Sequence, residues 1–130
     1  MDPVSNRFTC NPSDLGNIRG FVDSFVQQHE PSAWMVVNAV DELCANIAEH
    51  GKAKTVSVTL SKIDGQVVVV IKDRGKKFDL TKYESKDPME LIKLRATGGL
   101  GLTFIKRVMD LVTYERVGKV NICTCYKKAA

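Results

Sequence analysis

The chain has 130 residues, of which 44% are hydrophobic and 26% charged, a composition typical of one globular domain, so we expect a single domain over residues 1–130. Its formal charge of +4 is mild, and its Lys and Arg residues are scattered rather than interleaved with aromatic residues, which argues against direct nucleic-acid binding. No secretion signal begins the sequence and no apolar run approaches the roughly 18 residues that span a bilayer. We therefore expect a cytoplasmic protein without a membrane segment.

The cysteine pattern gives little support to a metal–thiolate site. The four cysteines form no CxxC pair, and the chain has only two histidines that could complete a zinc site. Cys123 and Cys125 lie two apart in a predicted strand, so their side chains share one face and are expected to pack in the core. Free thiols are typical of a reducing compartment.

The first half of the chain predicts one strand followed by two helices. Residues 7–10 form a short strand candidate that ends before a proline. Residues 13–30 predict a helix, because Ser13 can cap it and apolar residues then recur at helical spacing. A second helix is predicted over residues 33–50, ending at Gly51.

The second half predicts two hairpins separated by a long loop. Residues 55–61 and 66–72 alternate as strands around an Asp-Gly turn. The pattern then breaks over residues 73–98, where a short helix over 87–94 is possible, and a loop of this length is usually functional or disordered.

A last helix and hairpin complete the predicted architecture. We expect a helix over residues 99–110, then strands over 111–117 and 120–126. This order of elements predicts an α+β fold, a two-layer α/β sandwich in which helices cover one face of a mixed, mostly antiparallel sheet.

The first candidate functional segment lies on the second predicted helix. Glu42, Asn46 and either Glu49 or His50 are spaced four and then three or four residues apart, so they share one helical face. The Asn46 carbonyl suits a hard cation such as Mg²⁺, and Glu42, one turn earlier, is placed to accept a proton nearby. The alternative is a solvated polar stripe on an amphipathic helix.

The second segment is Asp73-Arg74-Gly75, directly after an apolar strand. An aspartate at a strand end can present its carboxylate to a pocket and accept a hydrogen bond from an exocyclic amine, while the glycine lets the backbone approach the ligand. The alternative is a simple turn.

The third segment is Thr97-Gly98-Gly99-Leu100-Gly101-Leu102, which runs into the last predicted helix. Glycines before a helix N-terminus let backbone N–H groups approach phosphate oxygens. The segment is neither a P-loop nor a GxGxxG fingerprint, and the alternative is a flexible hinge.

Taken in this order, the three segments resemble the N, G1 and G2 boxes of the GHKL ATPase superfamily, whose ATP-binding domain has the Bergerat fold. Within that superfamily the chain is similar to the anti-sigma factor serine kinases, and the similarity covers nearly the whole chain. It is carried by the strings NIAEHG at 46–51, DRGKKFD at 73–79, GGLGL at 98–102, YER at 114–116 and VNI at 120–122. One position departs from the pattern, because Lys77 stands where many GHKL proteins have a second glycine.

The resemblance implies a role for each matching residue. Asp73 would read the adenine amino group, Asn46 would bind Mg²⁺ that bridges the phosphates, and Glu42 would be the base toward a serine hydroxyl. A lid over residues about 79–97 would close on the triphosphate, and Arg95 in it would meet the γ-phosphate. The remaining nucleotide-binding residues that the resemblance implies are Gly75, Thr97, Gly98, Gly99, Leu100 and Gly101.

The function that the resemblance implies is an ATP-dependent protein serine kinase. It would phosphorylate an STAS-type anti-anti-sigma protein, hold a sigma factor or similar regulator, and form a homodimer. Two alternatives remain at this point. One is a nucleotide-gated interaction module without transfer activity, and the other is the catalytic fragment of a histidine kinase.

Overall fold

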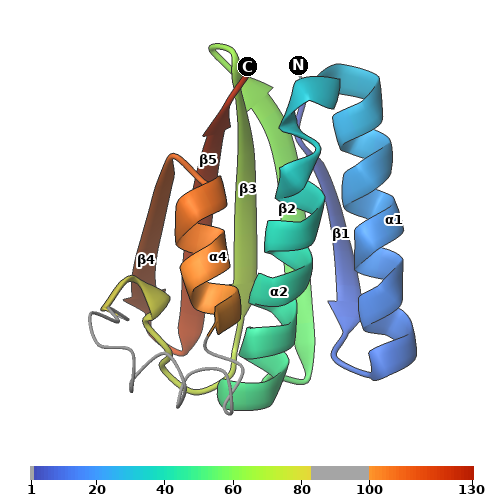
Figure 1. Cartoon of the computed structure of the whole chain (residues 1–130). Coiled ribbons are helices and arrows are strands. Elements are labelled where there is room, and N and C mark those ends of the chain that lie inside the picture. The colour runs from blue at the N-terminus through green and yellow to red at the C-terminus, as the bar shows by residue number, and fades with distance from the viewer. Residues whose placement is uncertain (1, 83–99) are drawn as a thin grey trace.

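The computed structural model describes residues 2–82 and 100–130 of the chain. In these ranges, three α-helices lie on one face of a five-stranded sheet (Figure 1). The strands are β1 (Val4–Thr9), β2 (Thr55–Ile63), β3 (Gln66–Asp73), β4 (Leu111–Val117) and β5 (Val120–Lys128). The helices are α1 (Pro12–His29), α2 (Met35–His50) and α4 (Leu100–Val108), and the short 3₁₀ turns are η1 (Pro31–Ala33) and η2 (Leu80–Lys82). The predicted α+β sandwich is confirmed.

The sheet has the strand order β1-β2-β3-β5-β4, and each pair of neighbours is antiparallel. The prediction of a mixed sheet was wrong in this detail, since the described residues contain no parallel pair. The reason is the second hairpin, which places β5 rather than β4 beside β3. The chain therefore returns from α4 to the edge of the sheet and then enters its centre in the antiparallel sense.

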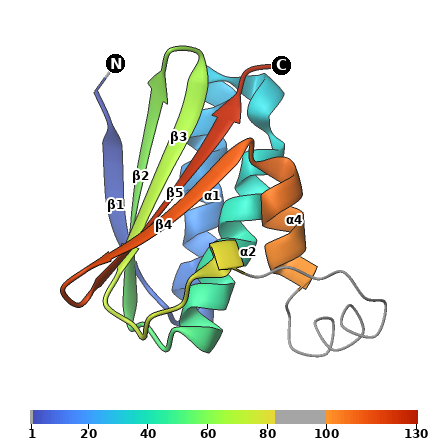
Figure 2. The same ribbon diagram turned by 90° about the vertical axis from the view of Figure 1, so that its left-hand side faces the viewer.

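The core lies between the sheet and the helices. Alternate residues of β3 face the helix layer, and Val67, Val69 and Ile71 are fully buried there. The helices contribute the apolar residues Ile18, Val22, Phe25, Val26, Val36, Val40, Leu43, Ile47 and Ile105. The opposite face of the sheet carries no helix in the described residues (Figure 2). Among the described helices, none combines the length and apolarity that a membrane span requires.

Several element boundaries differ from the predicted ones. Helix α1 begins at Pro12 after Asn11, so Ser13 lies inside its first turn, where a proline is well tolerated because its missing N–H would have no partner. Helix α4 ends at Val108, two residues earlier than predicted. The predicted short helix over 87–94 lies outside the described residues.

The cysteines are packing residues in this fold. Cys44, Cys123 and Cys125 are buried in the core, and all four cysteines are free thiols. Burial raises the pKa of the Cys44 thiol, so it stays protonated and behaves as a small apolar side chain. The predicted packing role of Cys123 and Cys125 is therefore confirmed.

Candidate functional site

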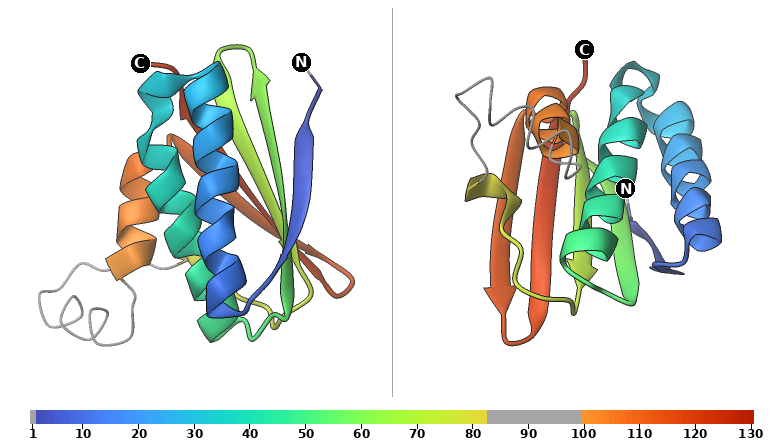
Figure 3. Two further views of the ribbon diagram at one scale, coloured as in Figure 1. Left: turned by 90° about the vertical axis from the view of Figure 1, so that its right-hand side faces the viewer. Right: turned by 60° about the horizontal axis from the view of Figure 1, so that its bottom comes forward.

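Segments that are far apart in the sequence meet at one end of the molecule. Helix α2 ends at this end, strand β3 ends here with Asp73, and the described part of α4 begins here (Figures 1 and 3). The start of β5 and the end of β4 lie at the same end, because these strands form a hairpin next to β3. The fold thus brings the first two predicted segments and the described end of the third to a common edge.

Buried polar side chains concentrate at this edge. Four polar residues are buried among the described residues, and Ser61 in β2 is one of them. The other three are Asn46 of α2, Asp73 of β3 and Asn121 of β5, with 3%, 7% and 4% of their surfaces exposed. Burying a polar group without hydrogen-bond partners costs free energy, so a concentration of such groups indicates a functional site.

The Asp73 carboxylate is held through one of its two oxygens. Its Oδ1 accepts hydrogen bonds from the Gly75 backbone N–H at 2.8 Å and from Asn121 Nδ2 at 3.0 Å. In the described part of the chain, no group donates to Oδ2. Asp73 therefore has a fixed orientation and an acceptor oxygen left over for a ligand's N–H group.

The Asn121 side chain is the hub of this network. Besides Asp73, its Nδ2 donates to the backbone carbonyls of Gly75 and Lys76, at 3.2 and 3.0 Å. Its Oδ1 accepts from Arg116 Nη1 at 2.8 Å and from the Tyr114 hydroxyl. This one amide therefore ties together β3, the loop after it, and β4.

No role in the site was predicted for Asn121, Tyr114 and Arg116, although they belong to the strings that carry the family resemblance. All three are core-facing positions in the last hairpin, and Asn121 shares its face of β5 with the buried Cys123 and Cys125. A polar residue in an otherwise apolar strand face was the available signal. This signal did not identify the hydrogen-bond partner of Asn121, because the sequence does not show which strand pairs with β5.

Gly75 is in contact with the end of helix α2, backbone against backbone. A Cβ at Gly75 would stand 2.4 Å from the Gly51 carbonyl oxygen and 3.0 Å from the Ala53 nitrogen. The same Gly51 carbonyl accepts a hydrogen bond from the Lys76 N–H at 2.6 Å. A side chain at position 75 would therefore push the loop away from α2.

We expect Gly75→Ala to lower the free energy of unfolding by about 1–3 kcal/mol, the usual cost of forcing an extra methyl into a packed position. Urea unfolding monitored by circular dichroism measures the change. Gly20→Ala is the matched control, because a Cβ at this exposed helical position meets nothing within 4 Å. The control should raise stability by about 0.5–1 kcal/mol. An equal loss in both variants would contradict the contact.

The α2 residues form the second part of the site. Asn46 Nδ2 donates to the Glu42 backbone carbonyl at 2.7 Å, so the amide is anchored on its own helix and no described group donates to its Oδ1. Glu42 itself is exposed. Of the two open candidates one turn later, Glu49 is exposed, whereas His50 stacks on Phe78 with ring centroids 5.4 Å apart. Asn46 thus offers a buried oxygen, and Glu42 offers a carboxylate to solvent.

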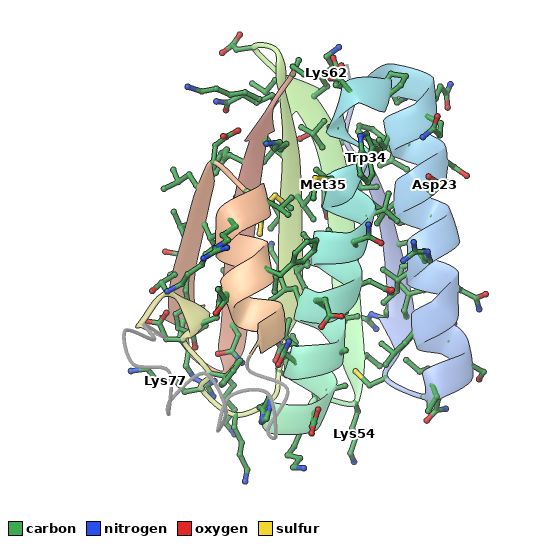
Figure 4. The ribbon with its side chains drawn as sticks, viewed as in Figure 1. Asp23, Trp34, Met35, Lys54, Lys62 and Lys77 are labelled. Atoms are coloured by element: carbon green, nitrogen blue, oxygen red, sulfur yellow. The ribbon has the colours of Figure 1, made fainter. Side chains whose placement is uncertain are left out.

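Lysines surround this end of the molecule. Lys76 and Lys77 follow Asp73 in an exposed loop, and Lys54 lies at the same end (Figure 4). None of the three forms an ion pair with a described residue. Their charge favours an anionic ligand. Lys77 has no positive φ, so this position does not require the conformational freedom of a glycine.

A narrow cavity of about 10 Å³ lies between the end of α2 and strand β5. Ile47 and Cys123 give it apolar walls, Asp73 and Asn121 give it polar ones, and Phe78 is part of its lining. Apolar walls with a few convergent polar groups are the usual lining of a small-molecule site, and Phe78 and Leu80 narrow the space here.

The structure places only some of the predicted site residues. Most of the predicted lid, residues 83–97, lies outside the described residues, and this part includes Arg95 and Thr97. The same holds for Gly98 and Gly99. Of the third segment, Leu100 and Gly101 are described as the first residues of α4. The assembled part of the candidate site therefore consists of α2, the end of β3 and the last hairpin.

The chain is similar to serine-protein kinases named RsbW. One from Staphylococcus aureus (strain MSSA476) is 32% identical over 93 residues, which cover 65% of this chain and 58% of that protein. Another from S. aureus is 33% identical over 100 residues, which cover 69% of this chain and 63% of that protein. The chain thus matches less than two thirds of the length of these relatives.

A solved structure and a family model extend the comparison to nearly the whole chain. The structure of the RsbU and RsbW domains of Rv1364c from Mycobacterium tuberculosis matches with a TM-score of 0.68 at 15% identity. The match covers 98% of this chain and 32% of that one, and it shows a shared fold. The model of the histidine kinase-like ATPase domain matches residues 8–127. The resemblance to GHKL proteins and to anti-sigma kinases is confirmed, and the chain belongs to the histidine kinase-like ATPase domain family.

Proposed function

We propose that the chain is an ATP-dependent protein serine kinase of the anti-sigma type. The observation that carries the proposal is the pair of buried acceptor oxygens, Asp73 Oδ2 and Asn46 Oδ1, to which no described group donates. Both belong to side chains whose other polar atom is fixed by a hydrogen bond. Family membership and the similarity to serine-protein kinases support the same reading.

In this proposal the nucleotide base enters the cavity beside Asp73. The adenine amino group donates to Asp73 Oδ2, and Gly75 keeps the loop close to the base. Phe78 and Leu80 line the narrow cavity, so they move aside when the base enters. The phosphates are bound by Thr97, Gly98, Gly99, Leu100 and Gly101 under a lid over residues about 79–97.

The phosphate end of the site is formed by α2 and the cations around it. Asn46 Oδ1 would hold Mg²⁺, for which an amide oxygen is a suitable ligand, and the ion would neutralise phosphate charge when bound. Arg95 in the lid is proposed to meet the γ-phosphate. The exposed Lys76 and Lys77 add positive potential at the entrance.

Phosphoryl transfer in this proposal uses Glu42 as the base. The serine Oγ of the partner forms a bond to the γ-phosphorus, the bond from that phosphorus to the bridging oxygen breaks, and ADP leaves with the bond's electron pair. The serine proton goes to the Glu42 carboxylate. Glu42 is exposed, which lets a protein substrate reach it, and it lies one helical turn from Asn46.

Glu42→Gln tests the assignment of the base. We expect transfer to fall by about 100-fold or more, because the amide cannot take the proton, while ATP binding changes less than twofold. Single-turnover transfer from γ-³²P-labelled ATP to a purified STAS-type protein gives the rate, and calorimetry gives the affinity. The exposed Glu49→Gln, on the same helix, is the matched control and should leave both unchanged. Full activity in Glu42→Gln would remove Glu42 from the mechanism.

The proposed partners are an STAS-type anti-anti-sigma protein, which is phosphorylated, and a sigma factor or similar regulator, which is held. We propose a homodimer in the cytoplasm, where the four cysteines stay reduced. Sedimentation velocity measures the oligomeric state. If the wild-type chain binds ATP and a partner but transfers no phosphate, the domain is a nucleotide-gated interaction module instead.

A further inference from the structure

The face of the sheet that carries no helix has a cluster of cations at one end. Arg7, Ser57 and Lys72 lie in one row across β1, β2 and β3, because Arg7 pairs with Ser57 and Ser57 with Lys72. Their side chains point away from the helix layer, since their sequence neighbours Phe8, Val56 and Ile71 are buried in the core. Thr55 and Arg74 lie beside this row at the same end of the sheet.

These five side chains line a recess in the surface. It has a volume of about 210 Å³, and Val120 and Asp73 complete its lining. The Asp73 carboxylate is engaged on the other side of the sheet, where its Oδ1 accepts from Asn121 and Gly75. The recess and the cavity in which we place the nucleotide base therefore lie on opposite faces of the sheet, although Asp73 is part of the lining of both.

The three cations of the recess have no counter-ion among the residues that the structure describes. Neither Arg7, Lys72 nor Arg74 forms an ion pair with a residue in the described ranges, where the ion pairs are Arg19–Asp41 and Lys62–Glu30. Neighbouring strands are about 4.8 Å apart, so Arg7 and Lys72 start about 10 Å from each other and both can reach one central anion. Without an anion, these like charges repel one another.

We propose that this recess binds a phosphate monoester. A carboxylate carries one charge and is satisfied by one arginine, whereas a phosphoryl dianion has three acceptor oxygens and can engage two guanidinium groups and an ammonium at once. Ser57 and Thr55, which also line the recess, have hydroxyl groups that can donate further hydrogen bonds. This site does not depend on the proposed kinase activity, because it uses the opposite face of the sheet.

A titration of the full chain with O-phospho-L-serine, followed by amide NMR, tests the site. We expect saturable changes in the amide chemical shifts of Arg7, Ser57 and Lys72. Titration with unphosphorylated serine should leave these chemical shifts unchanged. Shifts confined to Gly75 and Asn121 would place the anion in the nucleotide site and overturn the proposal. No saturable shift at the three row residues would overturn it as well.

Two charge-removing variants and one matched control make the test specific. Arg7→Gln and Lys72→Gln should each weaken binding about tenfold, the usual effect of losing one hydrogen bond to a charged group. Lys128→Gln removes one positive charge from the same face of the sheet, but Lys128 pairs with Gln66 at the opposite end of β3. This variant should therefore change the affinity less than twofold. Melting curves check that all three variants fold. Equal weakening of the affinity by all three variants would indicate non-specific electrostatic attraction of the anion and would contradict the proposal.

A phosphoserine peptide distinguishes the two sources of such a group. Tighter binding of the peptide than of the free amino acid would assign the recess to a phosphorylated partner protein. Equal affinity would assign it to a small phosphate ester. If neither probe binds, the recess is not a phosphate site.

Discussion

Asp73→Asn should weaken ATP binding by about 100-fold and leave the fold intact. The substitution is isosteric, and the amide oxygen of asparagine can still accept from the Gly75 N–H and from Asn121 Nδ2. The NH₂ group would then replace Oδ2, so a donor would face the amino group of adenine. A lost hydrogen bond to a charged group, with a donor left unpaired, costs about 2–3 kcal/mol. Calorimetry with and without Mg²⁺ measures the change.

Inosine triphosphate provides the matched ligand control for this variant. It has a carbonyl oxygen where ATP has the amino group, so it suits a donor and not a carboxylate. The wild type should therefore prefer ATP, and Asp73→Asn should reduce or reverse that preference. An equal loss of affinity for both nucleotides would indicate that the substitution disrupts the loop after β3. Unchanged ATP affinity would contradict the role of Asp73.

Asn121→Leu should lower the free energy of unfolding by about 3–5 kcal/mol. Leucine has a similar volume, but it leaves the Asp73 carboxylate without its side-chain donor and the Gly75 carbonyl without one of its donors. It also removes the acceptor of Arg116 and Tyr114. Several buried polar groups lose partners at once, and each carries a desolvation cost of about 1–3 kcal/mol. The midpoint of thermal unfolding should fall by roughly 10–20 °C.

Tyr114→Phe is the graded control for the network. It removes one hydroxyl from the Asn121 amide and leaves the Asp73 contact in place, so we expect a loss of about 1 kcal/mol. A loss in Asn121→Leu no larger than that of the control would mean that the amide is not the hub. Urea unfolding of both variants under one set of conditions decides the comparison.

Local patterns were enough to predict most of the architecture. The alternation over 55–61, the Asp-Gly turn and the helical spacing of α1 and α2 depend on neighbouring residues, and each element formed as expected. The position of Asp73 at a strand end was predictable for the same reason, because the apolar run before it marks β3. The motif order then indicated the family.

The contacts that complete the site depend on distant pairings, which no local pattern specifies. Asp73 and Asn121 are 48 residues apart and meet only because β5 lies next to β3 in one register. A shift of one residue would turn Asn121 to the other face of the sheet. The contact of Gly75 with Gly51 is equally non-local, and the alignment of Arg7 with Lys72 needs the pairing of three strands.

The central place of β5 has a consequence for how the protein is made. Strand β3 can pair with β2 as soon as both are synthesised, but its other edge, with the apolar run Val67–Ile71, has no partner until β5 follows. At ribosomal rates of about 5–20 residues per second, the 48 residues from Asp73 to Asn121 take roughly 2–10 s to add. An open, apolar strand edge is a template for pairing with other chains. The nascent protein is therefore most prone to aggregate during this interval, before the last hairpin closes the sheet.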